Sequence, residues 1–115
     1  MKVEDLDVFK LSHELTLQVY EITKNFPEEE KYGLISQMRR SASSVPTNLM
    51  EGGHRFNKNE YKHFVSISRG SCGELKYQLL LSKDLKYIDE EKYSKVKEGC
   101  DRISMMLTKL YNSLK

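Results

Sequence analysis

Long apolar runs are missing from this chain, and their absence argues against a protein that spans a membrane. No uninterrupted apolar segment approaches the roughly 20 residues that a membrane-spanning helix needs. The start of the chain, Met1 to Asp7, is acidic and has no apolar run behind it, which fits neither a signal peptide nor a transit peptide. We therefore expect a cytoplasmic protein with no membrane association.

Cysteine is also scarce. Only Cys72 and Cys100 are present, and their spacing matches no metal-ligand motif, so we expect two buried, reduced thiols that pack as small hydrophobic residues. A chain of 115 residues can bury roughly two thirds of its unfolded surface without a disulfide or a metal to hold the core. The prediction is one domain, residues 1–115.

Net charge is low, at +2, so composition alone makes no case for a nucleic-acid or membrane partner. The distribution of charge is more informative. From residue 31 to residue 70 the chain has seven basic and two acidic residues, a local charge of +5, while the rest of the chain carries −3. The basic residues of this interval are Lys31, Arg39, Arg40, Arg55, Lys58, Lys62 and Arg69.

Apolar residues recur at three- and four-residue spacing in four segments, about 7–26, 34–52, 58–86 and 89–114. No segment has the alternation of a β-strand. Asp7, Asn57 and Asp89 precede three of the segments as N-caps, and Glu60 completes an Asn-x-x-Glu capping box. The pattern predicts an all-α protein, an antiparallel up-down-up-down four-helix bundle.

Pro46 interrupts the second segment, whose apolar stripe continues through it. A proline there removes one backbone hydrogen bond and clashes with the carbonyl of Ala42, so we expect a kinked or loosened turn that costs roughly 3 kcal/mol if nothing compensates. The hydroxyls of Ser43 and Ser44 are candidates to bond the freed carbonyls. Further along, the polar side chains of Asn48 and Glu51 are interpreted as ties that hold the end of this helix, which closes at Gly52 and Gly53.

Small residues fill the middle of the third segment, from Ser66 to Gly73. If the second and third helices form an antiparallel hairpin about Arg55, the residue opposite position x lies near 110 − x. Ala42 then faces Ser68, and Arg40 faces Gly70. Small residues at matched levels let two helices approach more closely than the usual 8 to 10 Å.

Two Glu-x-x-His pairs, Glu51 with His54 and Glu60 with His63, have the spacing that di-iron bundles use. Both pairs border the same turn, and the other helices offer no inward glutamate, so a metal-binding bundle is the weakest alternative. No Gly-x-Ser-x-Gly elbow or phosphate-binding loop is present. We expect no enzymatic activity and no cofactor.

The basic interval supports a stronger hypothesis, a surface for RNA or DNA on the second and third helices and their turn. Phe56 and Tyr61 add aromatic rings that could stack on bases. In the alternative, Arg39 or Arg40 pairs internally with Glu51 or Glu74, and the protein is a structural or protein-binding oligomer with no nucleic-acid role. The candidate nucleic-acid residues are Arg39, Arg40, Arg55, Lys58, Lys62 and Arg69.

The stretch from Arg39 to Gly52 reads Arg-Arg-Ser-Ala-Ser-Ser-Val-Pro-Thr-Asn-Leu-Met-Glu-Gly. It closely resembles a motif of the four-helix bundle family of intervening-sequence proteins, which are encoded within insertions in bacterial large-subunit ribosomal RNA genes and are also found elsewhere. The likeness extends over nearly the whole chain, including residues 6–9, 26–34 and 64–75.

The resemblance implies a ring-like homo-oligomer, expected to be a pentamer. It also implies a distant similarity to the accessory bundle proteins of diversity-generating retroelements, which are basic and bind nucleic acid. It implies no enzymatic activity. The leading hypothesis from the sequence is therefore a ring-forming module with a basic surface for RNA or DNA, and another protein is the alternative partner.

Overall fold

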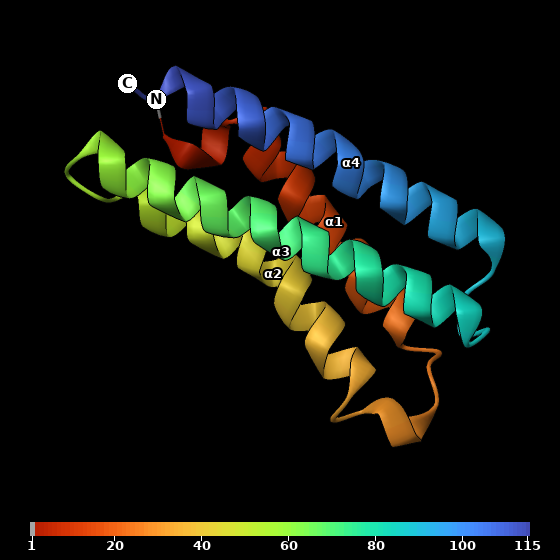
Figure 1. Ribbon diagram of the computed structural model, residues 1–115. Coiled ribbons are helices and arrows are strands. Elements are labelled where there is room, and N and C mark those ends of the chain that lie inside the picture. Colours follow the sequence, from red (N-terminus) through yellow and green to blue (C-terminus); the bar gives the residue numbers. More distant parts are fainter. Residues whose placement is uncertain (1) are drawn as a thin grey trace.

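The computed structural model describes residues 2–115, and this part of the chain is all-α and contains no strand (Figure 1). The four α-helices of the predicted bundle are present. They are α1 (Asp7–Thr23), α2 (Leu34–Gly53), α3 (Lys58–Asp84) and α4 (Glu90–Ser113). Two short 3-10 helices, η1 (Val3–Asp5) and η2 (Glu28–Glu30), precede α1 and α2. No helix within residues 2–115 combines the length and the apolar character required to cross a bilayer.

Helices that follow one another in the chain pack together, and α1 also packs on α4. The order of the contacts places the start of α3 beside the end of α2. For example, the Ser68 hydroxyl donates to the Val45 carbonyl at 2.9 Å, while Ser82, farther along α3, reaches the sulfur of Met38, farther back in α2. The molecule is elongated, 43 × 24 × 20 Å, and both termini lie at the same end in Figure 1.

The core takes one face from each helix and forms a single cluster. Burial excludes nearly all water from its central side chains, which on an area basis is the main force that holds such a bundle together. The fully buried aliphatic and sulfur-containing residues are Val19, Met38, Ala42, Val45, Leu49, Cys72, Leu75, Leu79, Cys100 and Leu107.

The first helix is shorter than its apolar pattern predicts. It ends at Thr23 rather than at Phe26. The Thr23 hydroxyl bonds the carbonyls of Val19 and Tyr20, at 2.7 and 3.2 Å, and the chain then turns so that the Phe26 ring packs on the ring of Tyr87 with centroids 5.2 Å apart. Phe26 is therefore buried, but from a turn rather than from the helix.

Two of the three predicted caps are confirmed. The side chains of Asn57 and Asp89 accept hydrogen bonds from the backbone N–H groups of Glu60 and Lys92, each at 2.8 Å. The third prediction is wrong, because Asp7 is the first residue of α1 and Leu6 takes the N-cap position without a side-chain bond.

The end of α3 is a Schellman motif. The Tyr87 N–H donates to the Ser82 carbonyl and the Lys86 N–H to the Lys83 carbonyl. Lys86 has φ = 66°, a left-handed conformation that usually belongs to glycine. Because of this turn, the third helix ends at Asp84 instead of continuing to Lys86 as predicted.

The register between α2 and α3 differs from the prediction by about one helical turn. Ser68 bonds Val45, and Ser71 bonds Ser44 at 2.9 Å. The residue numbers of each pair therefore add up to more than the 110 that the predicted hairpin requires. The small residues also divide between two sides of α3. A Cβ atom built on Gly70 or Gly73 would have nothing within 4 Å, so these glycines face open space and not α2.

The close approach of α2 and α3 occurs instead at Gly52. A Cβ atom on Gly52 would lie 2.8 Å from the Cβ of Phe64 and 3.1 Å from the ring of Tyr61. No other side chain fits at this position without a shift of the backbone of one helix. Gly52 therefore packs the end of α2 directly against the first turns of α3.

α2 continues through Pro46 as one helix, and the predicted kink stays a prediction. The compensation for the missing amide comes from another helix. The Thr16 hydroxyl of α1 lies 3.1 Å from the Ala42 carbonyl, the group that Pro46 leaves without its helical donor. The same hydroxyl is 2.8 Å from the Ser12 carbonyl, so its proton is shared between two acceptors. Ser43 and Ser44, the predicted donors, bond elsewhere.

Replacing Thr16 by valine keeps the shape of the side chain but removes this donor. We expect the free energy of unfolding to fall by about 1 kcal/mol, because a partly buried carbonyl loses a partner. In a Pro46→Ala background the backbone amide of residue 46 can bond Ala42, so the same Thr16→Val change is expected to have a smaller effect. Urea denaturation of the wild type, both single variants and the double variant measures this coupling. Additive effects of the two substitutions would contradict a role of Thr16 in compensating Pro46.

Candidate nucleic-acid interface

The six candidate nucleic-acid residues fall into three separate groups in the structure. Arg39 and Arg40 lie in the first half of α2, beside α1. Arg55 and Lys58 border the turn between α2 and α3, while Lys62 and Arg69 lie on the side of α3 that meets α4. At 1.5 Å rise per residue, Arg40 is about 20 Å along α2 from its C-terminal end. The residues therefore do not form one continuous patch.

Arg39 ties α2 to α1. Its Nε donates to Thr23 Oγ1 at 2.9 Å, its Nη2 donates to the Tyr20 carbonyl at 3.3 Å, and its guanidinium lies 4.5 Å from the centre of the Tyr20 ring. The internal partner expected from the sequence was Glu51 or Glu74. Arg39 does bond within its own chain, but to Thr23 and Tyr20. Arg40, the next residue, is exposed.

Arg55 is partly neutralised. Its Nη2 lies 2.6 Å from Glu51 Oε1, and its Nη1 lies 4.0 Å from Glu60 Oε1. The guanidinium also covers the Phe64 ring at 4.8 Å. The neighbouring Lys58 is exposed at the start of α3, and no ion pair within residues 2–115 includes it.

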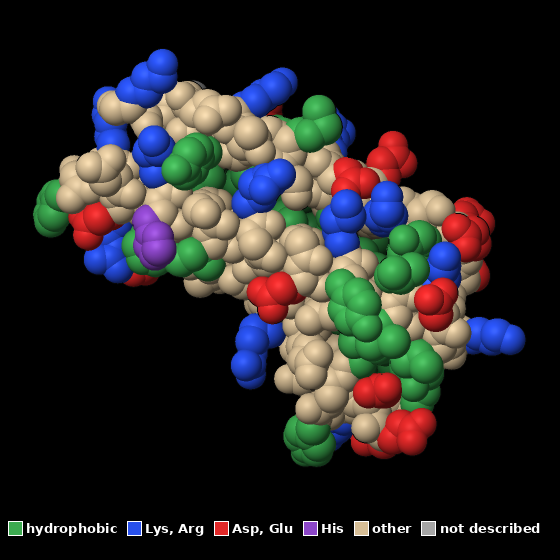
Figure 2. All heavy atoms as spheres, viewed as in Figure 1, with side chains coloured by type: hydrophobic (Ala, Val, Ile, Leu, Met, Phe, Trp, Pro, Cys, Tyr) green, Lys and Arg blue, Asp and Glu red, His purple; other side chains and the backbone are tan. Residues whose placement is uncertain are grey.

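Arg69 lines a pocket of about 340 Å³ between α3 and α4, and Lys62 contacts Tyr111, another residue of its lining. The Lys62 ammonium is 4.6 Å from the centre of the Tyr111 ring, and Arg69 lines the pocket itself. No carboxylate of the described residues pairs with either cation. On the face in Figure 2, Lys and Arg side chains are spread along the molecule, with hydrophobic side chains between them.

The remaining residues of the predicted motif have structural roles or are exposed. The Asn48 amide donates to both the carbonyl and the hydroxyl of Ser44, at 2.8 Å each, and thereby supports the turn that contains Pro46. Pro46 itself is buried. Glu74 is exposed on α3, and among residues 2–115 it joins no ion pair.

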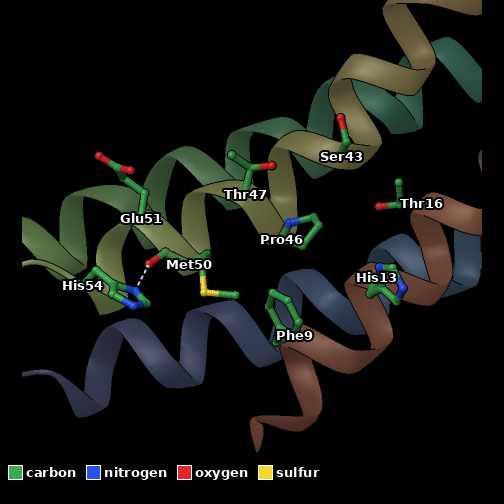
Figure 3. Close-up of a pocket in the computed structure, with 9 residues that line it drawn as sticks. All are labelled: Phe9, His13, Thr16, Ser43, Pro46, Thr47, Met50, Glu51 and His54. Carbon is green, nitrogen blue, oxygen red and sulfur yellow. Dashed lines mark hydrogen bonds between the residues drawn. The ribbon is translucent and has the colours of Figure 1, made fainter. Parts of the chain in front are cut away.

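The two Glu-x-x-His pairs do not converge on a common point. In the first pair, Glu51 is held by Arg55, while His54 Nδ1 lies 2.9 Å from the Met50 carbonyl (Figure 3). In the second, Glu60 Oε2 accepts from the Asn57 side chain, and the His63 ring packs edge-on against Phe64. Within the described part of the chain, no three His, Cys, Asp or Glu side chains are grouped so as to hold a metal ion.

A hollow of about 580 Å³ lies between α1 and α2. Phe9, Pro46 and Met50 form its apolar floor, and Figure 3 shows His13 and His54 on different helices at its two ends. The hollow has no cation other than what a protonated histidine would supply. It is therefore a poorer match for a polyanion than the α3–α4 pocket.

Both cysteines are buried and free. Burial raises the pKa of the Cys72 thiol to about 11 and that of the Cys100 thiol to about 12. Because the thiolate is the reactive form, neither residue has the character of a catalytic nucleophile at neutral pH.

The sequence model of the 23S rRNA-intervening sequence proteins matches residues 4–109 of the chain. The chain belongs to this family. Among solved structures, the chain is similar to a protein of unknown function from the S23 ribosomal protein family of Bacteroides thetaiotaomicron, with a TM-score of 0.81 and 21% sequence identity over 90% of this chain and 97% of the other. That similarity supports the fold. No curated protein matches the sequence.

Two residues of the α3–α4 pocket were not predicted from the sequence. Tyr111 and Thr108 of α4 line the α3–α4 pocket with Arg69. The available signal was the spacing of the fourth apolar stripe, whose members Leu107 and Leu110 place Thr108 and Tyr111 one residue beyond the buried positions. Such flanking positions lie where a neighbouring helix meets the surface.

Arg39 and Arg40 allow a direct test of whether the contacts of Arg39 stabilise the fold, because the adjacent Arg40 is exposed. Arg39→Gln is expected to lower the free energy of unfolding by about 1 kcal/mol, because it removes two hydrogen bonds and a cation–π contact that are partly exposed. Arg40→Gln, its matched control, should change stability by less than about 0.5 kcal/mol. Chemical denaturation at equal protein concentration measures both. Equal effects of the two substitutions would show that the Arg39 contacts do not stabilise the fold.

Proposed function

We propose that this protein is a non-enzymatic, homo-oligomeric helical module of the cytoplasm that binds RNA or DNA through basic residues of α2 and α3. The observation that carries the proposal is that Arg40, Lys58, Lys62 and Arg69 join no ion pair within residues 2–115. Cations without carboxylate partners keep their full charge for phosphates.

The non-enzymatic part of the proposal is supported by the engagement of the residues that catalysis would need. The carboxylates near the histidines are held by Arg55 or by a helix cap, and the thiols are buried with raised pKa values. The surface therefore offers charge and aromatic rings rather than an activated nucleophile or base.

Self-association is supported by an open face of α3. Gly70 and Gly73 have free space above them, and Tyr77, on the same side of the helix, is 63% exposed. Glycine in a helix interior is unfavourable by about 1 kcal/mol relative to alanine, so two glycines without a close neighbour in the subunit fit a contact with a second copy. A ring, with a pentamer as the expected form, would repeat the local charge of +5 around the assembly.

A protein-binding oligomer without a nucleic-acid role is the second candidate. It is favoured by large apolar side chains on the surface, of which Phe56 is fully exposed and Tyr32 is 88% exposed. Both lie in turns outside the basic pocket, at the two ends of α2. Such rings are typical anchors at protein interfaces.

The nucleic-acid hypothesis predicts strongly salt-dependent binding. In a gel shift with mixed RNA and DNA strands, the logarithm of affinity should fall linearly with the logarithm of salt concentration. Changing Lys58 and Lys62 to glutamate should weaken binding at every salt concentration and flatten the slope, whereas Glu74→Gln should not weaken it. A protein that shifts no strand at low salt would leave the protein-binding alternative as the better explanation.

The self-association hypothesis predicts opposite effects of one double substitution on stability and on assembly. Gly70→Ala with Gly73→Ala should raise the stability of the isolated subunit by about 2 kcal/mol through helix propensity, about 1 kcal/mol for each glycine. The added methyl groups should weaken association, as seen by light scattering.

Gly99→Ala is the matched control, because its Cβ would lie 3.8 Å from Leu15, at ordinary contact distance and away from this face. A wild type that scatters as a 13.5 kDa monomer at micromolar concentration would refute the oligomer.

A further inference from the structure

Four cations on α3 recur at intervals of seven residues and all face α4. They are Lys62, Arg69, Lys76 and Lys83. Each meets α4 at a different level: Lys62 covers the Tyr111 ring, Lys76 Nζ lies 2.6 Å from Asp101, and Lys83 lies over the Tyr93 ring at 4.5 Å. Seven residues are two turns of helix, so the series keeps to one side of α3.

The two halves of this series differ in charge. In the second half, Asp101 pairs with Lys76 and with Lys97 at 3.2 Å, and these lysines hold the pKa of the Asp101 carboxyl below its usual value. Lys83 pairs with Glu90 at 3.7 Å. In the first half, no carboxylate of residues 2–115 lies within 4.0 Å of the side-chain nitrogens of Lys62 or Arg69. Only the first half therefore keeps uncompensated positive charge.

The pocket between α3 and α4 lies at this positive half. Val65 and Leu107 form its buried wall, Ser66 and Thr108 add hydroxyl groups, and Tyr111 contributes a ring that is 40% exposed. Its volume of about 340 Å³ is within the range of small-ligand sites. The Thr108 hydroxyl donates to the Ser104 carbonyl at 3.0 Å, which leaves the Ser66 hydroxyl as the free donor. The Arg69 guanidinium, this hydroxyl and the Tyr111 ring, with Lys62 against the same ring, match a phosphate joined to a flat base.

Lys62 is suited to a change of partner. Its ammonium now rests 4.6 Å from the centre of the Tyr111 ring, at the end of a flexible four-carbon chain. A phosphate beside Arg69 is a stronger partner for an ammonium than a ring, because the attraction is between full charges. Movement of Lys62 toward that phosphate uncovers the Tyr111 ring for stacking.

We propose that this pocket binds one nucleotide unit of a single-stranded nucleic acid, with the phosphate held by Arg69 and Lys62 and the base stacked on Tyr111. The inference rests on the proposed nucleic-acid function and specifies its site and its ligand class. Single strands are required because only an unpaired base can present its face to the ring, and a duplex presents phosphates alone. Among the other candidate residues, Arg39 and Arg55 are bonded to their own chain, and neither Arg40 nor Lys58 lines this pocket.

The test uses the full chain and fluorescence anisotropy with a labelled single strand of mixed sequence and with the same strand in a duplex. Tyr111→Leu should weaken single-strand binding roughly 5- to 150-fold and leave duplex binding unchanged. Tyr111→Phe, which keeps the ring, should bind as the wild type does. Arg69→Gln should weaken both and lower the salt slope for the single strand by about 0.7, the contribution of one phosphate.

Tyr93→Leu and Lys83→Gln are the matched controls, because they change the same kind of lysine–tyrosine pair where Glu90 already neutralises the cation. Both should bind the single strand normally, and thermal unfolding confirms that every variant is folded. A wild type that binds neither strand nor duplex overturns the proposed function itself. A wild type that binds, together with unaffected Tyr111→Leu and Arg69→Gln variants or equally impaired controls, overturns this site and leaves the function standing.

Discussion

The carbonyl of Ala42 is the group on which the arrangement of the helices depends. Pro46 has no amide hydrogen to offer it, and α2 cannot supply another. The donor comes from Thr16 of α1, so the turn of α2 that contains the proline is bonded to its neighbour as well as packed against it. From the other side, the Ser68 hydroxyl of α3 donates to the Val45 carbonyl. α2, which contains the Arg39–Gly52 motif, is thereby hydrogen-bonded to α1 and to α3.

These bonds also set the rotation of α3. Each residue turns a helix by 100°, so once Ser68 and Ser71 point toward α2, the directions of the other side chains follow. Lys62 and Arg69 then point toward α4, and Gly70 and Gly73 point away from the core. The basic pocket and the open glycine face are therefore two sides of one helix, and their separation is a result of helical geometry.

Local patterns predicted the helices well, whereas contacts between helices could be predicted only in outline. The caps at Asn57 and Asp89 depend on residues three positions away and were visible in the sequence. Ile67 is 38% exposed although it is the more apolar residue, whereas the neighbouring Ser68 is fully buried, and a buried serine contributes no apolar signal to the sequence. Arg39 and its partners show the same limit. Its bonds to α1 require the packed arrangement of two helices, which no local spacing reveals.

The basic residues illustrate that closeness in the sequence does not predict which side of a helix a side chain lies on. Arg55, Lys58 and Lys62 are near one another in the chain, but only Lys62 lies against α4. The interval of seven residues, from Lys62 to Lys83, is the spacing that matters for a side chain facing a neighbouring helix. That spacing was present in the sequence, although the pairing with Asp101 and Glu90 that separates its two halves was not.

Glycine at positions 70 and 73 has a consequence for motion as well as for shape. α3 is the longest helix, with 27 residues, and its middle combines these glycines with serines of modest helix propensity. On one side this centre is held, because Ser68, Ser71 and Cys72 are buried and the two serines bond α2. On the side of the glycines no side chain covers the backbone. Motion of this part of α3 is therefore restrained from one side only, and a partner bound over the glycines would restrain it from both.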